Sequence, residues 1–254
     1  MWPHFAIEIG NTQGQIPLYG LMLGCGLITL FLGVDFAARR QGRDPEIIGR
    51  FHYCLLTAFL SGLASALLLT KLIHGADTPW GKMAAMPGIL GGTAGLIVAT
   101  RCWRVPLSDW LPLALPFLCL THAWGRLGCF LAGCCYGKPT ENALGVQFPE
   151  DSMACAAHGH VPVHPTQLYE LALLVGLAAA LHFAIPTAQR FWSYLLIYGT
   201  GRFAIEFLRG DDRGSIHLIA GLSPSQQLCL LFIAAGTGLA GRQWRQRQAA
   251  SPRT

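Results

Sequence analysis

Seven long apolar segments most constrain how this chain can fold. A helix that crosses a membrane needs about 20 mainly apolar residues, and seven stretches of the sequence meet or approach this length. They are residues 17–38, 52–73, 84–100, 107–124, 166–185, 191–208 and 224–241. Only 12% of the 254 residues are charged, whereas a soluble domain carries about 25%. The sequence therefore predicts an all-α polytopic membrane protein with one transmembrane domain over residues 1–254, and it argues against a soluble enzyme or a disordered chain.

Two of these segments contain residues that are unusual in regular helices. Pro112 and Pro116 lie inside the fourth segment, and we expect them to break the helix there. Gly91 and Gly92 belong to a glycine-rich run in the third segment. A second helix or a ligand can approach such a run closely.

The basic residues predict how the chain is oriented. Short loops on the cytoplasmic side of membrane proteins are enriched in Lys and Arg. The arginine-rich stretches here are 39–50, 101–104 and 242–253. Placing them inside puts the N-terminus outside and the C-terminus inside. Three further stretches then lie on the outer face: residues 1–16, 125–165 and 209–223. The net charge of +5 is thus a topology signal, and we expect no nucleic-acid partner.

Two arginines are candidates for binding an anion. Arg126 lies between Gly125 and Gly128, where a guanidinium and nearby backbone N–H groups can bind a phosphate. The alternative is an interfacial arginine that reaches the lipid headgroups. Arg202 and Glu206 share a helix face four residues apart. Ionisable residues inside a membrane segment are functional candidates, but a structural ion pair explains these two equally well.

The segment His164–Glu170 predicts the start of another helix. Pro165 is favoured in a first turn, and the side chains of Thr166 and Gln167 can satisfy its free N–H groups. Glu170 lies one turn further on. His164 is either a proton acceptor or a capping residue, and for Glu170 a structural and a functional role are equally well supported.

Cysteines and histidines gather in a loop that we expect over residues 125–165. They are Cys129, Cys134, Cys135, Cys155, His158, His160 and His164. Both residue types bind metals, but the cysteine spacing fits no standard zinc pattern. We therefore expect no metal and no other cofactor. A disulfide or a redox-sensitive thiol is the favoured interpretation on an oxidising outer face.

In order and spacing, these motifs resemble the prolipoprotein diacylglyceryl transferase family. The similar segments are Ile16-Pro17-Leu18-Tyr19-Gly20, Gly91-Gly92-Thr93-Ala94-Gly95, Gly125-Arg126-Leu127-Gly128, His164-Pro165-Thr166-Gln167-Leu168-Tyr169-Glu170 and Gly201-Arg202-Phe203, followed by Glu206 and Arg209. The resemblance implies a multi-pass protein of the bacterial inner membrane with its active site toward the outer leaflet. It implies that a diacylglyceryl group moves from phosphatidylglycerol to the lipobox cysteine of a prolipoprotein signal peptide, with release of glycerol-1-phosphate.

The resemblance also implies roles for single residues. Arg126 and Arg202 would bind the phosphate, and Glu206 would orient Arg202. Three residues would shape the site or move protons: Tyr19, Tyr198 and His164. The implied substrate-binding residues are Gly91, Gly92, Gly128, Gly137, Cys129, Cys134, Glu170 and Arg209.

The chain departs from the family pattern at three positions. Leu90 stands where the family has a histidine considered catalytic, Cys129 replaces an asparagine, and Cys134 replaces an acidic residue. His122 or His164 is then the substitute for the missing base. These departures define an alternative function, that of a divergent relative that binds lipid or carries out thiol redox chemistry without modifying lipoproteins.

Overall fold

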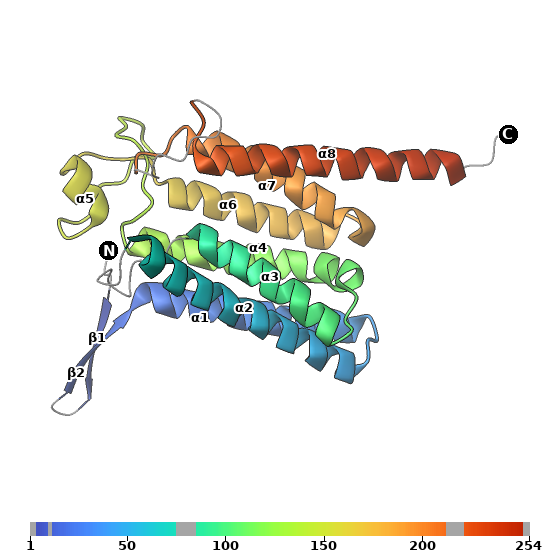
Figure 1. Cartoon of the computed structure of the whole chain (residues 1–254). Helices are drawn as coiled ribbons and strands as arrows, with labels where there is room; N and C mark the ends of the chain where they lie inside the picture. The colour runs from blue at the N-terminus through green and yellow to red at the C-terminus, as the bar shows by residue number, and fades with distance from the viewer. Residues whose placement is uncertain (1–3, 10–11, 75–84, 212–220, 251–254) are drawn as a thin grey trace. The chain divides into compact units, whose positions relative to one another are not determined.

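The chain is predominantly helical, with a β-hairpin near its N-terminus, in a computed structural model (Figure 1). The structure describes residues 4–9, 12–74, 85–211 and 221–250. Parts of the predicted segments 1–16, 84–100, 209–223 and 242–253 therefore lie outside the described residues. The elements are β1 His4–Ile9, β2 Thr12–Pro17, α1 Leu18–Arg40, α2 Pro45–His74, α3 Ala85–Cys102, α4 Leu107–Leu131, α5 Met153–His158, α6 Thr166–Ala179, the π-helix η1 Ala180–Ala184, the 3-10 helix η2 Thr187–Gln189, α7 Arg190–Glu206 and α8 Pro224–Ala250. The predicted helical class is confirmed, and the antiparallel pair β1–β2 is an addition to it.

Each of the seven apolar segments corresponds to a helix of the structure. Among the described residues, three helices are long and apolar enough to cross a membrane. They are Leu18–Arg40, Pro45–Leu69 and Thr166–Ala184. Their length and composition agree with a membrane protein.

Helix α4 is longer and more continuous than the sequence predicts. The expected break at Pro112 and Pro116 is wrong, because α4 runs unbroken from Leu107 to Leu131. A proline removes one backbone hydrogen bond, and membrane helices tolerate this where neighbouring groups satisfy the freed carbonyl. As a result, Arg126 and Cys129 lie in the last turns of a helix and not in a loop.

The chain divides into two compact units. One comprises residues 1–30 and 114–254, and the other comprises residues 31–113. In the second unit, α2 and α3 pack side by side (Figure 1). A side chain on Gly91 would collide with Ser65, and a Cβ on Gly92 would lie 3.1 Å from the carbonyl oxygen of Ala58. Close packing of two helices therefore accounts for these glycines, and their predicted substrate-binding role stays a prediction.

In the first unit, α6, α7 and α8 lie side by side (Figure 1). The start of α8 is fixed by a capping box: Gln226 N–H donates to Ser223 Oγ over 3.2 Å, and Ser223 N–H donates to Gln226 Oε1 over 3.0 Å. Pro224 occupies the first helical position, where its missing N–H costs nothing. This motif places Ser223 at a defined position beside the end of α7.

Residues 132–165 connect α4 to α6 and form a folded segment. Its own small apolar core contains Tyr136, Phe148, Ala154 and Val163. Bridges of β type join Gly137 to Arg209, just beyond α7, and Val146 to Val163. The segment therefore fixes the backbone that follows α4 against the end of α7.

Candidate active site

A fully buried carboxylate, Glu170, connects three helices. Its side chain is 0% exposed and comes from the second turn of α6. Oε1 accepts a hydrogen bond from Tyr198 Oη at 2.9 Å and lies 3.0 Å from Arg126 Nη2. Oε2 lies 3.3 Å from Arg202 Nε. A buried charge needs such partners to offset its lost hydration, so Glu170 ties α4 and α7 to α6.

Arg202 contacts a second carboxylate. Its Nη1 lies 2.6 Å from Glu206 Oε2, one turn further along α7, and its side chain is only 4% exposed. Ser223 Oγ donates to Glu206 Oε1 over 2.7 Å. The two carboxylates and the serine hydroxyl hold this guanidinium in one orientation.

Arg126 is the more accessible of the two arginines. Its side chain is 15% exposed. Within the described part of the chain, its one ion pair uses Nη2, whereas a guanidinium has five N–H donors in all. His122 lies one turn earlier in α4, with Nε2 3.5 Å from Glu170 Oε1 and its ring 5.6 Å from that of Tyr198. Arg126 therefore has donors left to bind an anion.

Other residues implied by the motifs lie outside this network. His164 Nδ1 is 3.1 Å from Tyr169 Oη. Arg209 forms a two-pronged ion pair with Asp211, at 2.8 and 2.7 Å. Tyr19, in the first turn of α1, packs on α4, where a Cβ on Gly128 would lie 3.0 Å from its ring.

Gly137 is required for a close approach of two backbones. A Cβ there would lie 2.6 Å from His164 Cβ and 2.7 Å from the carbonyl oxygens of both His164 and Leu208. Its own N–H donates to His164 O over 2.9 Å. Backbone packing accounts for this glycine, and substrate binding by Gly137 stays a prediction.

The first turn of α6 differs from the sequence prediction. Thr166 and Gln167 were expected to cap the helix, but both side chains bond to the chain after α4 and both are 0% exposed. Thr166 Oγ1 donates to Cys135 O over 2.8 Å, and Gln167 Nε2 donates to Cys134 O over 2.6 Å. The capping prediction is wrong, because both side chains donate to backbone carbonyl oxygens of the chain after α4 and no side chain caps the start of α6.

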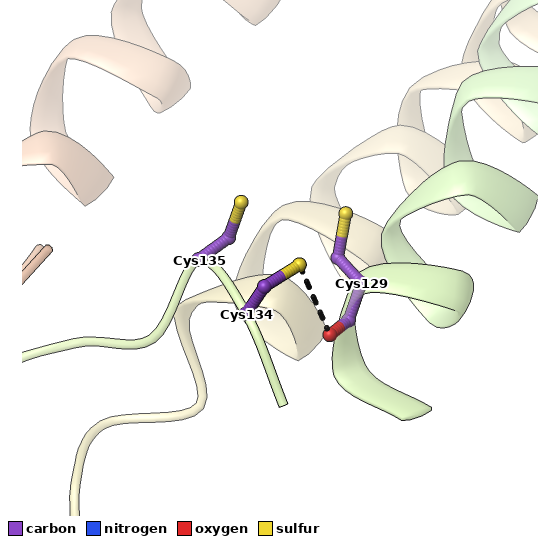
Figure 2. Close-up of side chains that lie close together, drawn as sticks. All are labelled: Cys129, Cys134 and Cys135. Atoms are coloured by element: carbon purple, nitrogen blue, oxygen red, sulfur yellow. Dashed lines mark hydrogen bonds between the residues drawn. The ribbon is translucent and has the colours of Figure 1, made fainter. Parts of the chain in front are cut away.

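Three cysteines come together beside this network. The Sγ atoms of Cys129, Cys134 and Cys135 all lie within 4.8 Å of one another, and Figure 2 shows them turned toward a common space. Cys134 Sγ also contacts Cys129 O at 3.7 Å. Hydrogen bonds within the cluster, aided by the charges of Arg209 and Arg126, hold the pKa of the Cys135 thiol below its usual range.

The remaining cysteine and histidines of residues 125–165 lie apart from this cluster. Cys155 Sγ is 3.9 Å from His160 Nδ1, and the ring of His158 packs edge-on against Tyr136. No disulfide is formed by the cysteines of the structure. The seven candidate ligands thus separate into one three-sulfur cluster and four side chains that do not belong to it.

Comparison with known proteins decides the family. The family model for prolipoprotein diacylglyceryl transferase matches residues 4–241. The chain belongs to the prolipoprotein diacylglyceryl transferase family. The resemblance found in the motifs is therefore confirmed, and the chain is placed among transferase enzymes.

Curated members of the transferase family match almost the whole chain. A phosphatidylglycerol–prolipoprotein diacylglyceryl transferase of Clostridium tetani is 30% identical and covers 86% of this chain and 89% of its own length. The transferase 2 of Clostridium perfringens is also 30% identical, with 91% and 92% covered. The transferase of Dehalococcoides mccartyi is 31% identical, with 96% and 95% covered.

Proposed function

We propose that this protein transfers a diacylglyceryl group from phosphatidylglycerol to the thiol of a lipobox cysteine in a prolipoprotein signal peptide. The sulfur attacks the glycerol carbon that bears the phosphate, the carbon–oxygen bond breaks, and glycerol-1-phosphate leaves. The observation that carries this proposal is the attachment of Arg126 and Arg202 to one buried carboxylate, Glu170, at 3.0 and 3.3 Å. Two guanidinium groups are thereby held at one place in an apolar protein.

The chemistry of the reaction suits this arrangement. A departing phosphate ester gains negative charge, which fixed donors stabilise in the transition state. Arg126 provides those donors, because its remaining N–H groups have no ion pair in the described residues. Arg202 sets the position of Glu170, and Glu206 orients Arg202. In this proposal, Tyr19, Tyr198 and His164 shape the site or move protons.

The same proposal includes the membrane topology. Seven spanning helices, one for each apolar segment, put the N-terminus outside and the C-terminus inside, in one transmembrane domain of the bacterial inner membrane. The active site then faces the outer leaflet, where it takes phosphatidylglycerol from among the membrane lipids. The arginines of residues 39–50 and 101–104 support this orientation.

A direct assay tests the transferase function. The purified protein is mixed with labelled phosphatidylglycerol and a peptide that carries a lipobox cysteine. We expect a thioether-linked peptide and free glycerol phosphate. Arg126→Gln removes the open donors, and the rate falls about 100-fold or more, while Arg245→Gln on the exposed side of α8 leaves the rate unchanged. Absence of both products from protein that still binds the lipid contradicts the proposal.

A second candidate function has one observation in its favour. The cluster of Cys129, Cys134 and Cys135 suits a lipid-binding protein that carries out thiol redox chemistry on the same scaffold without modifying lipoproteins. Thiol trapping in intact cells distinguishes the two functions. Redox cycling of the cluster supports the second candidate. Normal growth together with normal lipoprotein maturation, in cells in which all three cysteines are replaced by serine, removes that role.

A further inference from the structure

The three-cysteine cluster has the dimensions of a metal site. Sulfur atoms bound to one tetrahedral zinc ion, at about 2.3 Å each, are about 3.8 Å apart. The Sγ atoms of Cys129, Cys134 and Cys135 are separated by at most 4.8 Å. Rotation of these half-buried side chains, with a shift of each sulfur by about 1 Å, therefore brings the three sulfurs to the spacing that one zinc ion requires. Thiolate sulfur is a soft ligand and favours zinc over magnesium or calcium.

The backbone explains how two adjacent cysteines face one point. Consecutive side chains of an extended chain point in opposite directions. Cys135 instead adopts a left-handed conformation with φ +63°, which is rare for a residue with a side chain. This turn brings the sulfurs of Cys134 and Cys135 toward Cys129, at the end of α4 (Figure 2).

Contacts with α6 hold Cys134 and Cys135 in this conformation. The buried side chains of Thr166 and Gln167 donate to the carbonyl oxygens of Cys135 and Cys134. The strained backbone is thus imposed by α6, and strain of this kind persists only where its surroundings require it. A disulfide would use two of the three sulfurs at about 2 Å, and none is formed.

We propose that Cys129, Cys134 and Cys135 bind one zinc ion through three thiolates and leave its fourth position open for the thiol of the acceptor peptide. Three protein ligands and one exchangeable position define a catalytic zinc site. Arg126 and Arg209 both interact electrostatically with Cys135, and their positive charges offset part of the negative charge of the thiolates. This inference rests on the proposed transferase function, because it names the group that activates the acceptor.

The step balances without an oxidant or a reductant. The acceptor thiol binds zinc and releases its proton to solvent, since a thiol that coordinates zinc is deprotonated. The sulfur then uses its electron pair to form the carbon–sulfur bond. The carbon–oxygen bond breaks, and its electron pair leaves with the phosphate oxygen of glycerol-1-phosphate. The thioether binds zinc weakly and leaves, so the three protein thiolates and the open position are restored.

Metal content tests the site without any assay of activity. The protein is purified under reducing conditions, equilibrated with Zn²⁺ and freed of excess metal, and zinc per chain is measured. We expect one zinc ion in the wild type and none in a variant in which all three cysteines are serine. Cys102→Ser, at an exposed cysteine of the second unit, keeps the ion. A wild type without zinc, or a triple variant that retains it, overturns the proposal.

Cobalt substitution needs no variant, so failed folding cannot obscure the result. Co²⁺ bound by three sulfurs gives a sulfur-to-cobalt charge-transfer band in the wild-type protein, and the absence of this band overturns the site. Addition of a lipobox peptide changes the visible cobalt spectrum, whereas a peptide with serine at the lipobox position does not. An unchanged spectrum with the cysteine peptide overturns the open fourth position.

The two proposals fail in different ways. A protein that binds zinc and the peptide thiol but forms no thioether supports the metal site and contradicts the transferase function. If a chelator removes the metal and the protein still transfers the diacylglyceryl group at an unchanged rate, the transferase function is supported and the role of zinc is overturned. A rate that falls at least tenfold on stripping, and returns when Zn²⁺ is added, supports both.

Discussion

Replacement of Glu170 by glutamine tests the central contact of the site. Glutamine has the same shape and keeps an acceptor for Tyr198 Oη, but it removes the negative charge that Arg126 and Arg202 share. Arg202 retains Glu206 at 2.6 Å. Arg126 retains no ion pair among the described residues. The variant therefore leaves one largely buried cation without its carboxylate.

The cost follows from burial. Removal of one partner from a buried ion pair destabilises a protein by about 3–5 kcal/mol. A change of 1 kcal/mol shifts the Tm of a chain of this size by about 2–4 °C. We therefore expect Glu170→Gln to lower the Tm by about 6–20 °C. A second change, Arg126→Met, removes the unpaired cation, and the double variant should regain part of this loss, as expected for residues in direct contact.

Thermal unfolding in detergent, followed by circular dichroism, measures both effects. The matched control is Glu141→Gln, at an exposed residue of the segment after α4, which should change the Tm by less than about 2 °C. If the Tm of the Glu170→Gln protein equals that of the control, the assignment of Glu170 as the carboxylate that connects the helices is refuted. A double variant that is less stable than the single variant shows that Arg126 does not depend on Glu170.

Three further predictions concern buried contacts. Tyr198→Phe removes a buried hydrogen bond to a carboxylate and should lower the free energy of unfolding by about 1.5–3 kcal/mol, measured by denaturant titration in detergent. Gly137→Ala places a methyl group 2.7 Å or less from three atoms and should lower the free energy of unfolding by about 1–3 kcal/mol. In the control Gly125→Ala the methyl group meets no atom within 4 Å, so this variant should be neutral or stabilising. Equal Tm values for these two variants would contradict the packing argument. Gly91→Ala forces α3 away from Ser65 and should reduce the yield of folded protein in size-exclusion chromatography, whereas Gly88→Ala, with its nearest atom at 3.4 Å, should be tolerated.

The helices could be predicted from the sequence because the signal for each is local. Length and apolar composition within one segment indicate a helix. All seven segments are helical, and three of the described helices are long and apolar enough to cross a membrane. The prediction of a helix break at Pro112 and Pro116 was wrong because the signal that decides it is not local. Whether a freed carbonyl is satisfied depends on groups outside the segment, and the sequence around a proline does not contain that information.

The candidate site was predictable only in part. Arg126, Arg202 and Glu206 stand out because charged residues are rare in apolar segments. The central place of Glu170 depends on contacts among α4, α6 and α7, which no spacing along the chain reveals. Ser223 could have been found from its capping box with Gln226, but its bond to Glu206 could not. Cys129, Cys134 and Cys135 stand out in the sequence, but the convergence of their sulfur atoms does not, because spacing rules assume regular local geometry, which the left-handed Cys135 does not have.

The resemblance implies that the family has a histidine where this chain has Leu90, and residues other than cysteine where it has Cys129 and Cys134. The proposed zinc site would account for these three departures by one change in how the acceptor thiol is activated. A histidine base takes the proton from a thiol, whereas a zinc ion lowers the pKa of the thiol that it binds and needs no base at that position. His122 belongs to the Glu170 network, with its Nε2 3.5 Å from Glu170 Oε1. His164 contacts Tyr169 instead of the arginine network. A chain that binds zinc through Cys129, Cys134 and Cys135 therefore has no need of a histidine at residue 90, and the departures from the family pattern are those that a metal-activated thiol would permit.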